Sequence, residues 1–429
     1  MKTILALSAA LCLQASAGIQ YVIAISVDGL RGDFLETFVV GSPATFPNFA
    51  RLKNTGASTF NARCDYDYSE TVPNHIAMIS GRPVIQPGGL TASQFTGFTT
   101  NYANPSPADN GTDTIDTYVA TSGVNSGQYK ASIFDMVHDR GMSTAILLGK
   151  TRITILDRSF NTTNGALDVT GTDNGRDKID FAQIQNGTTS TLISTLTARI
   201  TGSTLEKFTF LHITDPDTTG HASSWTTTVG GAYRNTIITV DGYLGSIFAA
   251  LDGNATLAGK VAIILTADHG GGGVTSNAHT EATAAGNYTI PFFVVSPGVP
   301  AGSDLYSLFD NRVNPGATRP TFLAAAQPVH NADIANLSAE LIGVPQVTNS
   351  FLKPSLKKPV TVSADPSGNP TVNWPIYLTG WTLESCDDLA VAVPVWVTVT
   401  TGIAESATLK THTVTPAPAA RFFRLRSPL

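Results

Sequence analysis

Acidic and imidazole side chains recur directly after apolar segments of this sequence, where they could bind a metal ion. Asp28 follows YVIAISV, DPDTTGH follows FTFLHIT, and an Asp-His pair with four glycines follows VAIILTA. Carboxylates mixed with imidazoles suit zinc best, and manganese or another hard metal ion is also compatible with them. One Asp after a strand is often only a turn or cap residue, so the prediction depends on the whole set. The candidate ligands are Asp28, Asp217, His221, Asp268, His269 and His279.

A threonine precedes a helix-like stretch in SETVPNHIAMISG, residues 69–81. Pro73 suits the first turn of a helix, and Gly81 is typical of a helix end. Thr71 is therefore expected at a helix N-terminus, where free N–H groups and the helix dipole favour an anion. The alternative is that Thr71 only caps the helix.

The elements that must position these residues alternate between strand-like and helix-like segments. Continuous apolar runs indicate strands buried on both faces, and their alternation with helices predicts an α/β fold with a mainly parallel central sheet flanked by helices. Ligands bind such sheets beyond the carboxyl ends of the strands. The expected strands are 21–27, 143–149, 208–214, 261–267 and 289–296, and the expected helices include 47–55, 131–141, 188–200 and 231–251.

Three regions outside this alternation have a different composition. Residues 1–17 carry one Lys, an apolar stretch and a small-x-small end, which predicts a signal peptide and a secreted or periplasmic protein. Residues 84–128 are rich in Gly, Thr and Asn and are interpreted as a long excursion over the active face. After about 355 the helical pattern disappears, which predicts a catalytic domain at 18–354 and a small C-terminal β-sandwich at 355–429.

Composition limits the classes of partner. The 429 residues are 42% hydrophobic and 14% charged, with a formal net charge of −6. The absence of a dense Lys/Arg run argues against binding to a nucleic-acid polymer, whereas a small anionic substrate needs only a local positive site. Beyond the signal peptide, no segment approaches the roughly 20 apolar residues of a transmembrane helix.

The order of these motifs resembles the nucleotide pyrophosphatase/phosphodiesterase (type I phosphodiesterase) family of the alkaline phosphatase superfamily. The resemblance covers residues 20 to about 350, and the C-terminal module resembles small β-sandwiches of secreted bacterial hydrolases, which suggests attachment to a cell surface or glycan. The motifs are Asp at 28, Thr-x-Pro-Asn-His at 71–75, Pro-Asp-x-x-Gly-His at 216–221, Ala-Asp-His-Gly at 267–270 and His at 279.

The resemblance implies two zinc ions and a covalent mechanism. One ion would be held by Asp28, Thr71, Asp268 and His269, and the other by Asp217, His221 and His279. Thr71 would be the nucleophile that attacks phosphorus, and a water molecule would hydrolyse the phosphothreonine intermediate. Asn101 in GFTTN is the nearest match to the asparagine that contacts a phosphate oxygen in related enzymes, although its spacing differs.

The sequence also departs from the family pattern. Val72 stands where nucleotide-binding members place a Phe, and no Trp-Pro-Gly stretch is present. These differences put nucleotide preference in doubt and leave three functions open. The first is phosphodiester hydrolysis, the second is phosphomonoester hydrolysis at the same site, and the third is an inactive secreted surface-binding protein. The sulfatase pattern Cys-x-Pro-x-Arg is absent at 71–75.

Four further polar residues are given structural interpretations. His75 is expected in a capping role or beside a ligand, and His212, inside an apolar strand, as a core histidine with satisfied hydrogen bonds. Lys150 and Arg152 follow a strand end, where a solvated loop is favoured over contact with substrate charge.

Overall fold

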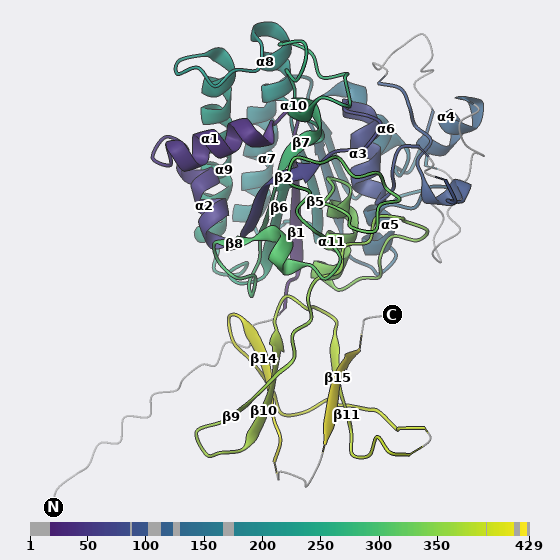
Figure 1. Ribbon diagram of the computed structural model, residues 1–429, viewed down its shortest axis with the longest axis vertical. Helices are drawn as coiled ribbons and strands as arrows, with labels where there is room; N and C mark the ends of the chain where they lie inside the picture. Colours follow the sequence, from purple (N-terminus) through teal and green to yellow (C-terminus); the bar gives the residue numbers. More distant parts are fainter. Residues whose placement is uncertain are drawn as a thin grey trace, which may run out of the picture.

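The computed structural model describes residues 18–85, 88–101, 113–122, 129–165, 176–391, 393–415 and 421–426. It contains a large α/β unit with a smaller unit of β-strands beneath it (Figure 1). The predicted signal peptide lies outside the described residues, as do parts of the predicted excursion over the active face. The described part of that excursion includes two short helices, η1 (Ala92–Gln94) and α4 (Ile115–Ser122).

An eight-stranded sheet forms the centre of the α/β unit, in the order β4-β3-β5-β1-β6-β7-β2-β8. The first five strands in this order run parallel to one another, while β7 runs antiparallel to both β6 and β2. The strands are β1 (Tyr21–Val27), β2 (Ala57–Arg63), β3 (Thr144–Leu148), β4 (Phe181–Ile184), β5 (Phe208–Ile213), β6 (Val261–Thr266), β7 (Thr289–Val295) and β8 (Ser303–Asp304). The mainly parallel sheet is therefore confirmed.

Helices cover both faces of the sheet (Figure 1). One layer contains α1 (Gly32–Gly41), α2 (Pro47–Thr55), α7 (Thr189–Thr201) and α9 (Ala232–Asp252). The other contains α3 (Thr71–Ser80), α5 (Ile133–His138) and α11 (Asp333–Ile342). The central strands β3 and β5 are buried along their whole length, as expected for apolar strands enclosed between two helical layers. The remaining short helices are η2 (Thr151–Ile153), α6 (Ile155–Arg158), α8 (Asp215–Ser223), α10 (Ala285–Tyr288) and η3 (Leu305–Leu308).

The C-terminal unit contains two antiparallel sheets, which confirms the predicted small β-sandwich. A four-stranded sheet has the order β13-β14-β10-β9, and a three-stranded sheet has the order β12-β11-β15. The strands are β9 (Thr361–Ala364), β10 (Pro370–Pro375), β11 (Thr382–Cys386), β12 (Val397–Thr398), β13 (Ile403–Glu405), β14 (Leu409–Thr413) and β15 (Phe422–Arg426). The exact boundary at 354–355 stays a prediction, because Leu356 still pairs with Phe309 of the α/β unit.

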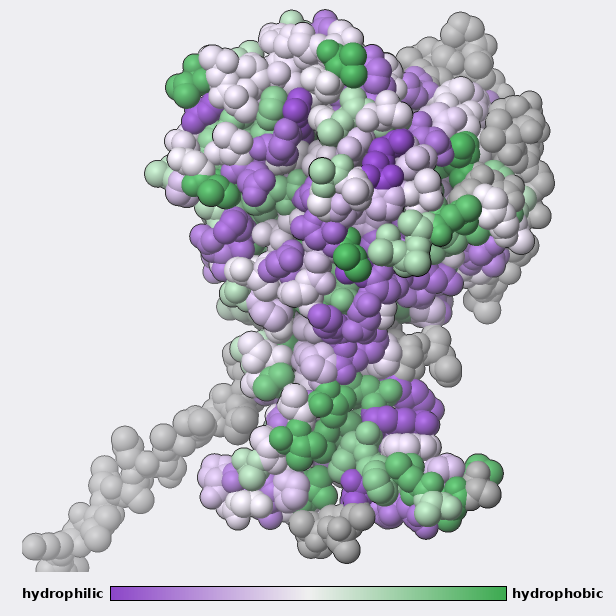
Figure 2. Space-filling model, in the orientation of Figure 1, coloured by the Kyte–Doolittle hydropathy of each residue, from purple (hydrophilic) through white to green (hydrophobic). Residues whose placement is uncertain are grey.

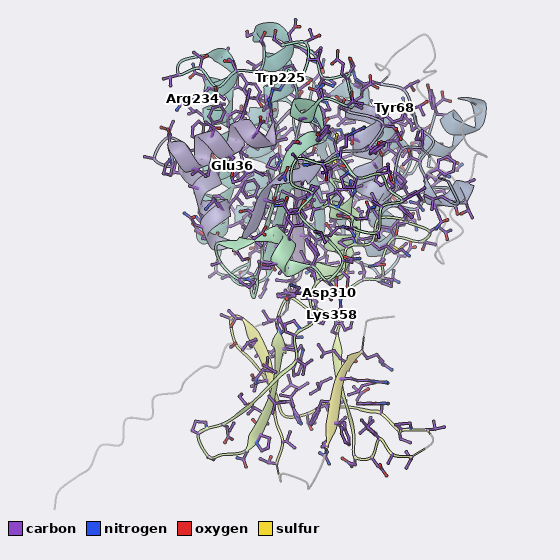
Figure 3. The ribbon with its side chains drawn as sticks, viewed as in Figure 1. Glu36, Tyr68, Trp225, Arg234, Asp310 and Lys358 are labelled. Carbon is purple, nitrogen blue, oxygen red and sulfur yellow. The ribbon has the colours of Figure 1, made fainter. Side chains whose placement is uncertain are left out.

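The surface differs between the two units. Figure 2 shows apolar residues gathered over the C-terminal unit, where Leu389 and Val395 are among the exposed side chains. In Figure 3, Asp310 and Lys358 lie at the junction, whereas Trp225 lies at the far end of the α/β unit. No helix among the described residues combines the length and apolar character needed to cross a membrane.

Candidate active site

Three aspartates reach one edge of the sheet because they follow three neighbouring parallel strands. Asp28 follows β1, Asp217 lies in the first turn of α8 after β5, and Asp268 follows β6. The strands are adjacent in the order β5-β1-β6, so their carboxyl ends bring the three side chains together. All three are buried, with exposed fractions of 0%, 3% and 0%.

Lys150 lies between two of these carboxylates. Its ammonium group is 2.7 Å from Asp28 Oδ2 and 2.5 Å from Asp217 Oδ2. Lys150 is the second residue after β3, the strand next to β5, and its side chain extends from there to both carboxylates. The interpretation of Lys150 as part of a solvated loop is therefore wrong, because this lysine spans the centre of the acidic cluster.

Each aspartate presents one oxygen that has no hydrogen-bond partner among the residues that the structure describes. These buried atoms are Asp28 Oδ1, Asp217 Oδ1 and Asp268 Oδ2. Leaving buried carboxylate oxygens unsatisfied is costly, so an arrangement with three of them indicates that another positive group belongs there. One ammonium against three carboxylates also leaves excess negative charge. The residues therefore fit a site for divalent cations.

The three candidate histidine ligands share one orientation. The Nδ1–H groups of His221, His269 and His279 each donate to a backbone carbonyl, at 2.9, 2.8 and 2.5 Å. Donation from Nδ1 leaves the lone pair on Nε2, the arrangement found when histidine binds a metal. The carbonyl acceptors belong to Asn277, Gly270 and Ser69.

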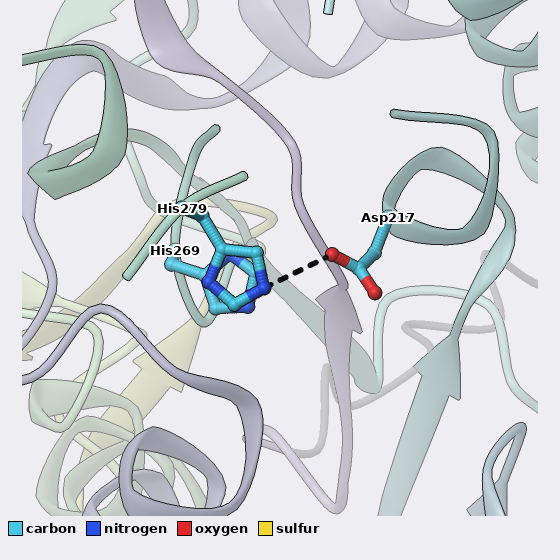
Figure 4. A group of neighbouring side chains, drawn as sticks. All are labelled: Asp217, His269 and His279. Carbon is cyan, nitrogen blue, oxygen red and sulfur yellow. Dashed lines mark ion pairs between the residues drawn. The ribbon is translucent and has the colours of Figure 1, made fainter. Parts of the chain in front are cut away.

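The Nε2 atoms face the unpartnered carboxylate oxygens. His269 Nε2 is 3.1 Å from Asp268 Oδ2 and 3.5 Å from Asp28 Oδ1, and His279 Nε2 is 3.5 Å from Asp217 Oδ1. Figure 4 shows His279 directed at Asp217, with the ring of His269 stacked behind it. Two ligands about 2.0–2.1 Å from a tetrahedral zinc stand about 3.3–3.4 Å apart. The distances of 3.1–3.5 Å between these Nε2 and carboxylate oxygen atoms are thus close to the distance expected between two ligands of one zinc ion.

Within the described part of the chain, two groups of residues meet the spacing required of a metal site, and they differ in part from the predicted ligand sets. One consists of Asp28, Asp268 and His269, and the other of Asp217, His269 and His279, so His269 contributes to both. His221 stands at the rim instead, with 48% of its side chain exposed and Nε2 3.4 Å from Asp217 Oδ1. The structure brings all six predicted aspartates and histidines together.

Thr71 stands beside this cluster at the first position of α3. Its Oγ is 3.4 Å from His269 Nε2, and the residue is 1% exposed. Asn101 lies at the same helix end, because its Oδ1 accepts the Val72 N–H at 3.1 Å. Val72 is fully buried and cannot stack on a nucleobase. His75 donates from Nδ1 to the Thr71 carbonyl at 2.7 Å, and the same nitrogen is 3.6 Å from Asp268 Oδ2, so His75 lies beside a candidate ligand.

A cleft of about 360 Å³ opens beside Thr71. Its lining residues among those described come from positions 71 to 279, at the end of the α/β unit away from the C-terminal sheets, and these described residues include no aromatic side chain apart from histidine. The lining residues are Thr71, Lys150, Thr151, Arg152, Asn186, Asp217, Thr218, His221 and His279. Arg152 lines this cleft together with Lys150, and its contact with substrate charge stays a prediction. The position of both residues just beyond β3 is the sequence signal that would have found them.

The electrostatics of the cluster are dominated by burial and by its excess negative charge. Burial alone would raise the pKa of Asp28, but Lys150 and His212 hold it well below its ordinary value. Burial, added to the charges of Asp28 and Asp217, raises the pKa of Asp268. Burial also lowers the pKa of His279 to about 2, which keeps its Nε2 lone pair free for a metal ion.

His212 was interpreted from the sequence as a core histidine, and the structure places it in the site. It is fully buried, and its Nε2 lies 3.1 Å from Asp28 Oδ2. Its Nδ1 accepts the Gly149 N–H at 3.1 Å. It has satisfied hydrogen bonds, as expected, but one of them reaches a candidate metal ligand.

Known proteins resemble this chain in fold and in sequence pattern. Among solved structures, a protein of the alkaline phosphatase superfamily from Vibrio parahaemolyticus matches with a TM-score of 0.50 and 14% identity, covering 84% of this chain and 78% of that one. Murine ectonucleotide pyrophosphatase/phosphodiesterase 5 matches with a TM-score of 0.48 and 14% identity, over 76% and 96% of the two chains.

The fold is thus similar to that of the Vibrio protein. No curated protein matches the sequence. The sequence profile described as type I phosphodiesterase/nucleotide pyrophosphatase matches residues 22–286, more than half of the chain and all of the metal cluster. The protein is thus a hydrolase that belongs to the type I phosphodiesterase/nucleotide pyrophosphatase family.

Proposed function

We propose that this protein is a secreted, metal-dependent hydrolase that cleaves small phosphodiesters, including nucleotide pyrophosphates, through a covalent phosphothreonine intermediate on Thr71. The observation that carries the proposal is the convergence of three unpartnered carboxylate oxygens and three Nε2 lone pairs beside one threonine hydroxyl. The location is supported by the signal-peptide pattern at 1–17.

Two divalent ions, most suitably zinc, would be held by the sets that the family resemblance implies. Asp28, Thr71, Asp268 and His269 would hold one, and Asp217, His221 and His279 would hold the other. When bound, such ions neutralise charge on the phosphoryl group and lower the pKa of a bound hydroxyl. The mixture of carboxylate and imidazole donors supports zinc over magnesium or calcium.

The residues of the chain supply the nucleophile and the binding site for the phosphoryl group. The Thr71 hydroxyl loses its proton to solvent, and its Oγ forms a bond to phosphorus while the bond to the leaving-group oxygen breaks. The leaving group departs with the electron pair of that bond and takes up a proton from solvent where its basicity requires one. Water then attacks phosphorus, the Oγ–P bond breaks, and phosphate or a phosphomonoester is released. The N-terminus of α3 adds a positive field at Thr71. Asn101, whose Oδ1 accepts the Val72 N–H, would contact a phosphoryl oxygen through its Nδ2.

Phosphomonoester hydrolysis is a second candidate function, and one observation favours it. Lys150 and Arg152 both line the cleft with Thr71. A phosphomonoester carries nearly two negative charges at neutral pH, whereas a diester carries one. Because Lys150 is already paired with Asp28 and Asp217, Arg152 is the cation that would complement the second charge of a monoester. The complete set of metal ligands argues against an inactive surface-binding protein, and a role of the C-terminal sheets in surface or glycan contact stays a prediction.

Hydrolysis of bis(4-nitrophenyl) phosphate and 4-nitrophenyl phosphate by the zinc-loaded protein tests the proposal. We expect both activities to fall by at least about 10³-fold in Thr71→Ala, because the covalent step is lost. Zinc content should stay within one ion of the wild type. Undiminished hydrolysis in Thr71→Ala, or a wild type that binds no divalent metal, would refute the mechanism. The ratio of the two kcat/KM values assigns the ester class.

A further inference from the structure

His212 has both ring nitrogens engaged, and its Nε2 faces the carboxylate of a candidate metal ligand, Asp28. It lies in β5, and its ring packs edge-on against His75 with centroids 4.7 Å apart. Nothing in the mechanism above uses it. Its contacts nevertheless connect the loop that carries Lys150 with the carboxylate of Asp28.

The hydrogen bonds of His212 fix its tautomer. A backbone N–H can only donate, so the Gly149 N–H identifies Nδ1 of His212 as the acceptor. The proton of the neutral ring is then on Nε2, where it is donated to Asp28 Oδ2 at 3.1 Å. This is the reverse of His221, His269 and His279, which donate from Nδ1 and keep Nε2 free. His212 is therefore a hydrogen-bond donor to a ligand and not a ligand itself.

Donation from His212 determines which oxygen of Asp28 is left free. Oδ2 receives both the imidazole N–H and the Lys150 ammonium, while Oδ1 is buried with no hydrogen-bond partner. Oδ1 faces His269 Nε2 at 3.5 Å. The lysine is a flexible donor shared with Asp217, whereas the imidazole is held at both nitrogens. The imidazole is thus the more rigid of the two constraints on carboxylate rotation.

We propose that His212 is a positioning residue that orients Asp28, so that Oδ1 is presented to the metal ion and metal affinity is raised. The inference rests on the metal site proposed above. Partners of metal ligands commonly change metal affinity by about 10–100-fold when they are removed. Gly149 contributes to the same arrangement, because its N–H selects the tautomer of His212. A Cβ atom at position 149 would lie 3.0 Å from the His212 carbonyl oxygen, so a larger residue would crowd this contact.

Two substitutions separate the donor from the bulk of the ring. The amide nitrogen of glutamine can reach the position of Nε2, so His212→Gln keeps the donor to Asp28. Asparagine reaches only the position of Nδ1, so His212→Asn loses that donor. Phe210→Leu, two residues earlier in β5 and also packed on His75, is a control for lost packing without a lost hydrogen bond.

Zinc affinity is measured by competition with a chromophoric chelator. Thermal unfolding in EDTA checks that each variant is folded, and kcat and KM are measured for the same variants. We expect zinc binding about 10–100-fold weaker in His212→Asn, within about threefold of wild type in His212→Gln, and unchanged in Phe210→Leu. Equal affinity in all folded variants, or equal weakening in both His212 variants, overturns the inference. A wild type without zinc affinity instead refutes the proposed function.

Nitrogen-15 NMR of the wild-type histidine rings provides a test that does not depend on variants folding. The ring of His212 is identified by the coupling of its Nδ1 to the Gly149 N–H across their hydrogen bond, because buried His330 also directs Nε2 at an amide oxygen, that of Gln327. We expect this ring to be protonated at Nε2 and not at Nδ1, both in EDTA and after addition of zinc. Protonation of this ring at Nδ1, or at both nitrogens, would overturn the assignment.

Discussion

Replacing Lys150 by methionine should destabilise the metal-free protein far more than the zinc-loaded protein. The ammonium group is 2.7 and 2.5 Å from two buried carboxylate oxygens, and 16% of the lysine side chain is exposed. Burial alone would lower the pKa of Lys150, but Asp28 and Asp217 outweigh it and raise the pKa, so the lysine is charged at neutral pH. Lys150→Met leaves both carboxylates buried without their counter-ion.

The expected loss follows from the cost of breaking a buried ion pair, which is about 3–5 kcal/mol. Unfolding entropies of about 2.1 cal/mol/K per residue, taken over the roughly 340 residues of the α/β unit, convert this loss into a fall in Tm of about 4–7 °C in EDTA. With zinc bound, positive charge is restored beside the same oxygens, so the fall in Tm should be less than half as large.

Differential scanning calorimetry of wild type and variant, in EDTA and in zinc, measures both values. Lys260→Met is the matched control, because Lys260 bonds only an exposed carbonyl of Thr256 and should change stability by at most about 0.5 kcal/mol. A loss that is the same with and without zinc would show that Lys150 contributes packing and not charge. No loss in EDTA would refute the electrostatic reasoning altogether.

Four further outcomes are expected. Chelation by EDTA should abolish hydrolysis and lower Tm, and zinc should restore both; activity that survives chelation would contradict the metal site. Asn101→Ala should lower kcat/KM by about 10²-fold with zinc affinity unchanged, and a parallel loss of zinc would instead indicate a folding defect. Arg152→Ala should lower kcat/KM for 4-nitrophenyl phosphate more than for the bis-ester, whereas equal losses would argue against charge recognition. Burial raises the pKa of Asp65 to about 7, so the native state keeps a proton that the unfolded chain releases near pH 4. The contribution of Asp65 to the free energy of unfolding therefore falls as pH rises from about 4 to 7. Denaturant unfolding in EDTA should show a flatter dependence of stability on pH for Asp65→Asn than for the wild type.

Much of the fold could be predicted because its strands are marked locally. The buried run at 21–27 and the helix at 47–55 coincide with β1 and α2. In contrast, β2 has a mixed polar sequence, ASTFNAR, and no strand was expected there. Its pairing with β7, including a register shift, depends on contacts far away in the sequence.

The sequence alone determined the residue types that carry the chemistry and the sheet edge at which they meet. Strand periodicity is a local property of the sequence. The carboxyl ends of parallel strands lie at one edge of the sheet whichever side chains the strands carry. Tertiary structure decided which oxygen of each aspartate stays free, which nitrogen of each histidine carries the proton, and that Lys150 and Arg152 face the cleft. Those features depend on hydrogen bonds such as Gly149–His212 and Lys150–Asp28, between residues 63 and 122 positions apart, which no local pattern records.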